Sequence, residues 1–226
     1  MSSSLNEVSI SCDSATLRGN LFIPPDANGI VIFAHGSGSS RHSPRNNYVA
    51  QTLHDKGLAT LLFDLLTTEE EEKERWTAHI RFNIPLLADR LVNTTYWIKN
   101  SRQTGRLRIG YFGASTGAAA ALVAAAKLPN LIDVVVSRGG RPDLAGKELE
   151  QVKAPTLLIV GENDKTVIDL NRKALKSLQN VNKKKIIIIP GASHLFEEPG
   201  ALEKVSRIAT DWFLIYLDKK MPVTSI

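Results

Sequence analysis

Ser115 is flanked by glycines in the sequence GASTG, which spans residues 113–117. The residues before it, LRIGYFG, are typical of a buried strand, and those after it, TGAAAALVAAAK, favour a helix. G-x-S-x-G at a strand-to-helix turn is the pattern of a nucleophile elbow, in which the turn exposes the serine hydroxyl. The helix start adds free N–H groups and a positive dipole beneath a developing oxyanion. We predict that Ser115 is a nucleophile in acyl transfer; the alternative is a tight turn whose glycines serve packing alone.

A serine nucleophile needs a base that is itself oriented by a third group. His194 directly follows the stretch IIIIPGAS at 186–193, and Asp164 directly follows the apolar run at 155–163. Ligand sites in open α/β sheets lie beyond the carboxyl ends of the strands, so both residues are suitably placed. The order Ser115, Asp164, His194 is that of one known triad architecture. We therefore predict a catalytic triad, against the alternatives of a loop histidine and a turn or N-cap aspartate.

An oxyanion hole would complete this site. We expect one N–H donor from Thr116 and a second from the loop HGSGSS at 35–40, where Ser37 is the predicted donor. The loop has neither the third glycine of G-x-G-x-x-G nor the Gly-Lys-Ser/Thr of a P-loop, so it does not predict a nucleotide site. His35 is expected to be structural, and His54, inside a helical pattern, is expected at the surface.

Short apolar runs predict strands at residues 7–12, 16–24, 29–36, 58–64, 107–113, 132–139, 155–163 and 184–192. Helical patterns predict helices at residues 43–57, 78–100, 116–128, 166–180 and 200–218. Pro85 is expected to kink its helix, the acidic run at 68–75 to be a solvated loop or helix start, and the first two strands to form a hairpin around Asp13 and Ser14. The alternation predicts a single domain over residues 1–226, an α/β three-layer sandwich with a mostly parallel sheet.

The chain resembles the α/β-hydrolase superfamily and, within it, the dienelactone-hydrolase-like branch. The resemblance runs from NLFIP to the last predicted helix and rests on FAHGSGSS, GYFGASTGAAAAL, VGENDKTV and PGASHLF. It implies an eight-stranded sheet with an antiparallel second strand, a serine-type hydrolytic mechanism, and no metal or organic cofactor. Dienelactone hydrolases proper carry a cysteine nucleophile where this chain has Ser115, so the resemblance does not extend to their substrate.

Many α/β-hydrolases insert a lid after the sixth strand, but here that connection is short, which predicts a shallow site for small or polar acyl compounds. Arg138 and Arg141 follow the sixth strand, and Arg41 and Arg45 lie near the oxyanion side. The forked donors of arginine suit carboxylates. We hypothesise that Arg138, Arg141 and Arg41 bind an anionic group of the substrate. The alternative is structural pairing with Asp143, Asp64 or the run Glu69–Glu72.

Charge distribution and hydrophobicity indicate which kinds of molecule the protein binds. The net charge of +5 comes from scattered residues, and the one tight cluster, NKKK at 182–185, is typical of a turn that protects a strand edge. No nucleic-acid motif accompanies the charge, and no apolar run approaches the roughly 20 residues that span a bilayer. Cys12 is a single cysteine, and the N-terminal residues lack a signal-peptide pattern. We expect a cytoplasmic protein whose partner is a small acyl substrate, not nucleic acid or membrane.

The predicted reaction is hydrolysis of an ester through an acyl-enzyme intermediate. Because a histidine base must be neutral to accept a proton, activity should fall at acid pH. One alternative is thioesterase, amidase or acyltransferase chemistry in the same site. Another is a non-catalytic ligand-binding protein on the same scaffold, which would bind a small ligand tightly and turn over every ester slowly.

Overall fold

The computed structural model describes residues 5–13, 15–77 and 79–218. Its strands are β1 (Leu5–Cys12), β2 (Ala15–Phe22), β3 (Gly29–Ala34), β4 (Ala59–Phe63), β5 (Arg108–Ala114), β6 (Ile132–Arg138), β7 (Thr156–Gly161) and β8 (Lys184–Ile189). Its helices are α1 (Pro44–His54), α2 (Thr68–Thr77), α3 (Ile84–Asn100), α4 (Thr116–Lys127), α5 (Lys165–Ser177) and α6 (Ala201–Leu217), with 3₁₀ helices η1 (Ile80–Phe82) and η2 (Pro142–Gln151). Of the predicted β1–β2 turn, Asp13 is described and Ser14 lies outside the described residues.

The eight strands form one sheet in the order β1-β2-β4-β3-β5-β6-β7-β8. β2 is antiparallel to both β1 and β4, whereas the other neighbouring pairs are parallel. The mostly parallel eight-stranded α/β sheet predicted from the sequence, with its antiparallel second strand, is confirmed. No lid domain is evident among the described residues, and η2 occupies the short connection between β6 and β7.

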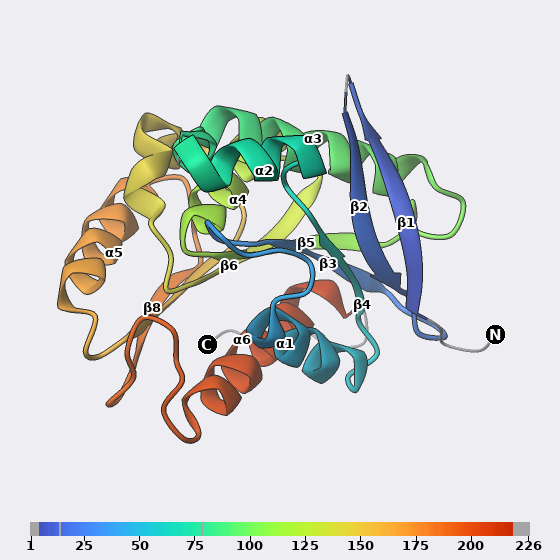
Figure 1. Cartoon of the computed structure of the whole chain (residues 1–226). Coiled ribbons are helices and arrows are strands. Elements are labelled where there is room, and N and C mark those ends of the chain that lie inside the picture. Colours follow the sequence, from blue (N-terminus) through green and yellow to red (C-terminus); the bar gives the residue numbers. More distant parts are fainter. Residues whose placement is uncertain (1–4, 14, 78, 219–226) are drawn as a thin grey trace.

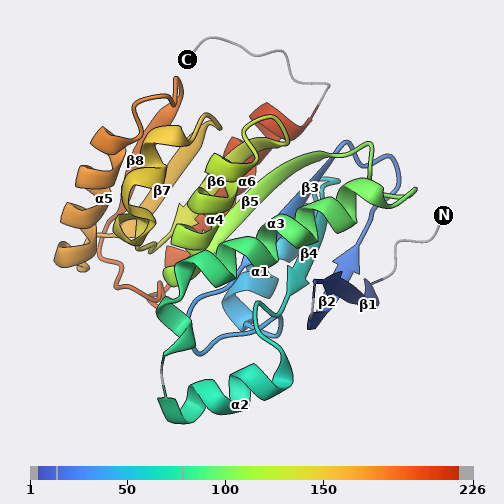
Figure 2. The same ribbon diagram turned by 90° about the horizontal axis from the view of Figure 1, so that it is seen from above.

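Both faces of the sheet are covered by helices, as Figure 1 shows. In β3, Ile30 and Ile32 join the core beneath α3 and α4, whereas Val31 and Phe33 join the core beneath α1 and α6. Successive side chains of a strand point to opposite faces, so a continuous apolar run is what a sheet covered on both sides requires. In the view from above, α2 lies apart from α3 and α4 (Figure 2).

The helix starts follow local capping rules. Ser43 caps α1 by accepting a hydrogen bond from the Asn46 N–H at 3.3 Å, and Pro44 follows it, as predicted. The acidic run forms α2. There Thr67 and Glu70 make a capping box, the Glu70 N–H donating to the Thr67 hydroxyl at 3.2 Å and the Thr67 N–H to the Glu70 carboxylate at 2.8 Å. Of the two forms expected for this run, the structure shows the helix.

Two expectations from the sequence are wrong. Pro85 does not kink a long helix, because α3 begins at Ile84 after the Asn83 cap and the missing proline N–H falls where no intrahelical partner exists. Ala78, the first residue of the helix predicted over 78–100, lies outside the described residues. His54 is half-buried rather than a surface residue: its ring stacks on Phe22 at 3.8 Å between centroids.

Candidate active site

Ser115 occupies the single residue between β5 and α4, with φ 50° and ψ −121°. A non-glycine residue in this left-handed region costs on the order of 1–3 kcal/mol and requires support from its surroundings. The glycines on either side are required by space: a Cβ at Gly113 would overlap the α4 backbone at Ala118, and one at Gly117 would overlap the carbonyl oxygen of Ala34. The turn therefore has the geometry of the predicted nucleophile elbow.

Backbone hydrogen bonds hold this strained turn. The Ser115 N–H donates to the Arg138 carbonyl at 3.3 Å, and the Ser115 carbonyl accepts from the N–H groups of Ala118 at 3.1 Å and Arg141 at 3.0 Å. The elbow is thus fixed to the end of β6 as well as to its own helix.

Asp164 and His194 come together from the ends of neighbouring strands. Asp164 lies between β7 and α5, and His194 lies in the loop between β8 and α6. The His194 Nδ1 donates to Asp164 Oδ2 at 2.6 Å, which leaves Nε2 as the nitrogen that can accept a proton. This is the arrangement of a histidine base held in one tautomer by a carboxylate.

No hydrogen bond joins Ser115 to His194 among the described residues. The two residues instead share a neighbouring backbone segment, residues 138–139. Gly139 follows Arg138, the backbone partner of Ser115, and a Cβ at Gly139 would lie 3.6 Å from His194 Cε1. Catalytic hydrogen bonds are often long before substrate binds. The structure thus brings Asp164 onto His194 and places His194 beside the backbone that supports the elbow.

The His194 loop is anchored on both sides of the imidazole. The Ser193 N–H donates to Glu198 Oε1 at 2.8 Å. Hydrogen bonding lowers the pKa of Glu198, first from the Ser193 side chain and less from this N–H. Phe196, with φ 57°, is 1% exposed and would lie 3.3 Å from a Cβ at Gly139. Sequence reasoning missed both anchors, since an ordinary Phe or Glu in a loop carries no signal of this role.

The two predicted oxyanion donors lie side by side. The Ser37 N–H donates to Thr116 Oγ1 at 3.1 Å, and the two side-chain hydroxyl oxygens are 3.0 Å apart. Thr116 is the first residue of α4, where backbone N–H groups have no acceptor within the helix. A carbonyl oxygen that entered here would therefore have to take the Ser37 N–H from the Thr116 hydroxyl.

His35 ties the oxyanion loop to the segment after β4. Its Nδ1 donates to the Gly36 carbonyl at 2.9 Å, and its Nε2 accepts from the Leu65 N–H at 3.0 Å. Burial lowers the pKa of His35. Both ring nitrogens are occupied and the ring is neutral, so His35 holds structure and is not available as a base.

Two of the three arginines predicted to bind substrate are engaged with carboxylates. The Arg41 guanidinium pairs with Asp64 and, at 3.1 Å, with Glu7. Arg141 makes a bidentate pair with Asp143, at 2.9 and 2.8 Å, which raises the pKa of Arg141. The pairs with Asp64 and Asp143 are structural pairs that the sequence left as the alternative, whereas the pair with Glu7 was not predicted.

Arg138 is different. It is buried at the end of β6, 8% exposed, and its Nε and Nη1 have no hydrogen-bond partner in the part of the chain that the structure describes. Its pKa is lowered to about 10, first by burial and then by the charge of Arg45. Of the three arginines, Arg138 alone has no carboxylate partner among the described residues, although the Nε of Arg41 is also buried without a hydrogen bond.

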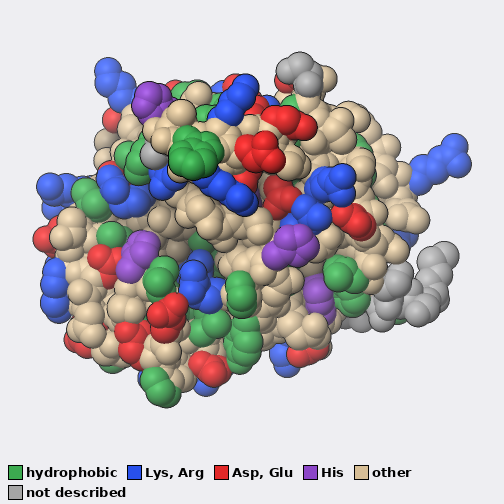
Figure 3. Space-filling view, viewed as in Figure 1, with side chains coloured by type: hydrophobic (Ala, Val, Ile, Leu, Met, Phe, Trp, Pro, Cys, Tyr) green, Lys and Arg blue, Asp and Glu red, His purple; other side chains and the backbone are tan. Residues whose placement is uncertain are grey.

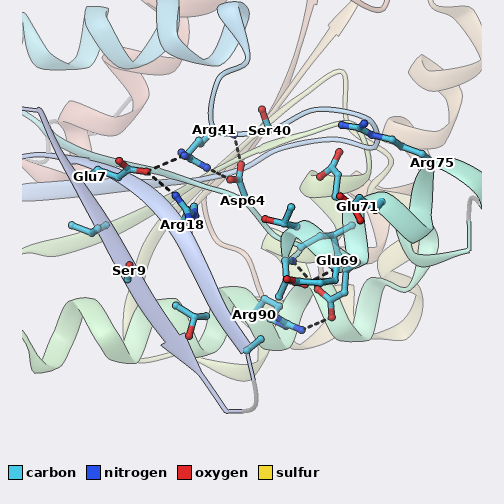
Figure 4. Close-up of a pocket in the computed structure, with 18 residues that line it drawn as sticks. Glu7, Ser9, Arg18, Ser40, Arg41, Asp64, Glu69, Glu71, Arg75 and Arg90 are labelled. Carbon is cyan, nitrogen blue, oxygen red and sulfur yellow. Dashed lines mark hydrogen bonds and ion pairs between the residues drawn. The ribbon is translucent and has the colours of Figure 1, made fainter.

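A large polar cavity adjoins the oxyanion loop. It measures about 930 Å³ and lies between the β1–β2 hairpin and α2, as Figure 4 shows. Arg41 projects into it between Glu7 and Asp64, and Arg90 reaches Glu70 at 2.7 Å. None of Ser115, Asp164 or His194 lines this cavity. Arg18, Arg41 and Arg90 in its walls pair with carboxylates, and acidic residues outnumber arginines in the lining.

The segment from α2 to η1 covers the oxyanion side. Glu71 and Arg81 from this segment line a cavity of about 20 Å³ together with His35, Ser37 and Thr116. The buried Glu74 holds the segment, accepting from the Ile80 N–H at 2.6 Å. The sequence predicted a loop or helix start at 68–75 and a helix over 78–100, but not that this segment packs against the oxyanion loop. Figure 3 shows acidic and basic side chains interspersed on this face.

The described residues hold neither a membrane-spanning helix nor a metal-binding cluster. No helix among them is long and apolar enough to cross a membrane. No group of three or more His, Cys, Asp and Glu side chains in those same ranges is arranged to hold a metal ion.

Comparison with known proteins gives consistent matches. The model of the dienelactone hydrolase family matches residues 17–213. Two proteins of Mycobacterium tuberculosis, each named "Putative phosphoribosyl transferase", are 53% identical over 211 residues, which is 93% of this chain and 46% of theirs. The chain thus spans less than half the length of these curated relatives.

Solved structures agree with this match. The crystal structure of a dienelactone hydrolase from Anabaena variabilis is 59% identical, with a TM-score of 0.93 over 95% of this chain and 99% of that one. Est1E from Butyrivibrio proteoclasticus shares the fold at 18% identity, with a TM-score of 0.75 over 93% of this chain and 98% of that one.

Proposed function

The chain belongs to the dienelactone hydrolase family, and from this premise we propose that it is a serine hydrolase that cleaves an ester or related acyl bond of a small substrate. The family and the solved structures support a hydrolase; the ester substrate and the triad are our proposal. The observation that carries it is the left-handed turn at Ser115, at the start of α4, beside a histidine bonded to a carboxylate.

The proposed reaction has two halves. His194 Nε2 takes the proton from the Ser115 hydroxyl as its oxygen attacks the ester carbonyl, and Asp164 stabilises the imidazolium through Nδ1–H. The N–H groups of Ser37 and Thr116 hold the oxyanion. The tetrahedral intermediate collapses, His194 protonates the leaving alcohol, and an acyl-serine remains. Water then repeats the sequence, with His194 as base, and releases the acid and free Ser115.

Ser115 rather than cysteine chemistry is proposed because of where Cys12 lies. Cys12 is 2% exposed in β1, and its Sγ is 3.9 Å from both the Arg90 carbonyl and the Thr94 hydroxyl. Burial raises the pKa of the Cys12 thiol, which disfavours a nucleophilic thiolate.

The name of the mycobacterial relatives does not favour a second function for this chain. It is attached to proteins of which the matched part is 46%. An elbow serine and a histidine held by a carboxylate support acyl chemistry, and no geometry of the described residues supports phosphoribosyl transfer.

The test is intact-mass analysis after exposure to a fluorophosphonate, which reports an activated serine without knowledge of the substrate. We expect one adduct on the parent chain and on Ser11→Ala, an exposed serine in β1, and none on Ser115→Ala. Labelling would justify a panel of esters, thioesters and alcohol acceptors, in which product partition separates hydrolysis from acyl transfer. An unlabelled parent chain would contradict the proposal and favour a ligand-binding protein.

A further inference from the structure

The positive charge of the chain is concentrated in one segment, residues 165–185. This segment has seven basic residues and one acidic residue, a net charge of +6, whereas the whole chain has +5, so the remaining residues sum to −1. The net charge, expected to come from scattered residues, therefore comes from this segment. All seven basic residues are exposed: Lys165, Arg172, Lys173, Lys176, Lys183, Lys184 and Lys185.

The fold brings the two halves of this segment together at one end of the sheet. There α5 packs against β7 and β8, as both ribbon views show (Figure 1 and Figure 2). Lys184 Nζ donates to the Leu178 carbonyl at 2.6 Å, which ties the start of β8 to the end of α5. The acidic residue, Asp169, pairs with Arg172 at 3.4 Å. The segment therefore forms one basic surface that its own carboxylate does not neutralise.

This surface includes the open backbone edge of β8, the last strand of the sheet. The Thr156 N–H of β7 donates to the Lys183 carbonyl at 3.0 Å. Because the backbone groups of a strand alternate between its two sides, the N–H and C=O groups of Lys184, Ile186 and Ile188 point away from β7. No other strand of the described residues pairs with them. Such an edge can pair with another extended chain.

The apolar side chains of β8 also lack a neighbour on this side. Ile186 and Ile188 pack against the α5 face of the sheet, and Ile187 packs against the α6 face. All three nevertheless remain half-exposed. A strand added beside β8 would cover them on both faces of the sheet while it paired with the open backbone groups.

The charge of the surface indicates which strand would be accepted. Lysines on an edge strand discourage pairing with a second copy of the same edge, because like charges would meet. A strand that carries carboxylates would instead meet opposite charge, so the lysines that exclude one partner attract the other.

Two other classes of partner fit this surface less well. Residues 165–189 contain no aromatic side chain on which nucleic-acid bases could stack. None of the large, well-exposed hydrophobic side chains of the described residues lies among them to enter a lipid layer. Only a polypeptide can continue the hydrogen-bond ladder of a sheet, and the open edge therefore favours a protein partner.

We propose that the edge of β8, residues 184–188, binds an extended acidic segment of another protein as an added strand, with the basic residues of α5 and of the start of β8 around it. The proposal is independent of the proposed hydrolase activity. Ser115→Ala should bind this partner as the parent chain does, so failure of the hydrolase would leave the result unaffected.

The test uses the fluorescein-labelled peptide EVEVEVE, in which carboxylates and valines alternate along a strand. KVKVKVK reverses its charge, and EVEPEVE keeps its charge but interrupts the strand with proline. We expect fluorescence anisotropy to show tight binding of EVEVEVE alone. We also expect bound peptide to slow hydrogen exchange at the amides of Lys184, Ile186 and Ile188, which point away from β7.

Two double variants test the role of charge. Lys173→Glu with Lys185→Glu reverses one charge on α5 and one on β8 and should weaken binding about tenfold. Lys56→Glu with Arg106→Glu makes the same change in net charge at exposed positions before β4 and β5, and should leave binding unchanged. If the first variant does not fold, the comparison of EVEVEVE with EVEPEVE on the parent chain decides.

Several results would overturn the proposal. Equal binding of EVEVEVE and EVEPEVE, or binding that leaves the three amides unprotected, would show attraction by charge without strand addition. Absence of binding at millimolar EVEVEVE would exclude the site. Binding of a short DNA duplex or of phosphatidylserine vesicles, lost in the Lys173→Glu and Lys185→Glu variant and seen without peptide binding, would assign the surface to nucleic acid or to membrane instead.

Discussion

Thr116 lies where two proposed oxyanion donors meet, and its hydroxyl accepts the N–H of one of them, Ser37. Ser37 has a glycine on either side, and Gly38 has φ 67°. His35 and the Ser39 N–H hold the loop at the Gly36 carbonyl, and Thr116 holds the Ser37 N–H itself. Thr116 is 4% exposed, and its hydroxyl therefore acts in a site from which water is largely excluded. We interpret Thr116 as a positioning residue for the Ser37 N–H.

Thr116→Val should lower kcat about tenfold and change KM little, because it keeps the shape of the side chain but removes the acceptor that orients the Ser37 N–H. The loss is expected to be smaller than the 10²–10³ typical of deleting an oxyanion donor outright. Steady-state kinetics on a neutral ester measures it. Thr116→Ser, which retains a hydroxyl, should recover most of the rate. Full activity in Thr116→Val would show that the hydroxyl pair has no positioning role.

At the scale of single residues, the sequence predicted positions better than partners. Asp164 and His194 were found because each follows a strand, and a strand end is visible as the end of an apolar run. Of the two partners of Arg41, Asp64 was named from the sequence, whereas Glu7 was not, since Glu7 lies on β1 and the antiparallel packing of β1 and β2 brings it near. Ion pairs between distant segments have no characteristic separation in the sequence, so spacing cannot predict them.

At the scale of secondary-structure elements, His54 joins α1 to the sheet. Its Nε2 is 2.6 Å from the Thr60 hydroxyl of β4, and its ring stacks on Phe22 of β2. Burial lowers the pKa of His54 to about 4, with a smaller opposing effect of Asp55. Protonation would place a charge in this junction, so the folded protein resists it.

The sign of the pH effect follows from this shift. The unfolded chain binds a proton at His54 as pH falls below about 6.5, whereas the folded protein does not until about pH 4. Stability should therefore be fully present above about pH 6.5 and decrease as the pH falls toward 4. Urea unfolding near neutral pH and at about pH 5 measures the decrease, which His54→Gln should reduce. His35, whose pKa is also lowered, should leave a residual slope. An undiminished slope in the variant would contradict this role of His54.

Helix starts were predicted well where local capping residues determine them, and the positions of helices were predicted poorly where tertiary contacts determine them. The start of α1 is coded by Ser43 and Pro44, and it lies where they indicate. The start of α2 is coded by Thr67 and Glu70, but its position over the oxyanion loop depends on Glu74 binding the backbone at Ile80. That contact closes a turn between two helices, and nothing in the local sequence specifies it.

At the scale of the whole molecule, the proposed nucleophile and its base follow different kinds of strand, one inside the sheet and one at its edge. Ser115 follows β5, which has paired strands on both sides and lies fourth from the β8 edge. His194 follows β8, which among the described strands pairs only with β7 and whose Ile186 to Ile188 side chains are half-exposed. The alternation of strands and helices predicted a mostly parallel sheet between two helical layers. It did not predict how exposed β8 is, because that depends on the elements that pack against this strand.

An edge strand bound on one side opens at lower free energy than the centre of its sheet. Partial detachment of β8 would carry His194 away from Asp164 while the remaining strands stay folded. We expect activity, and labelling of Ser115, to be lost at a lower urea concentration than the far-ultraviolet circular dichroism signal. Coincident midpoints would show that β8 unfolds only with the rest of the sheet.

The time for which stored protein keeps its activity would then depend on how often the edge strand β8 detaches, and not on the global stability of the core. A preparation that has lost its turnover could still scatter, sediment and absorb like native protein, and recover when its last strand re-docks. Stabilising substitutions chosen for a higher melting temperature would leave that lifetime unchanged unless they act on β8 and the loop that leads from it to His194.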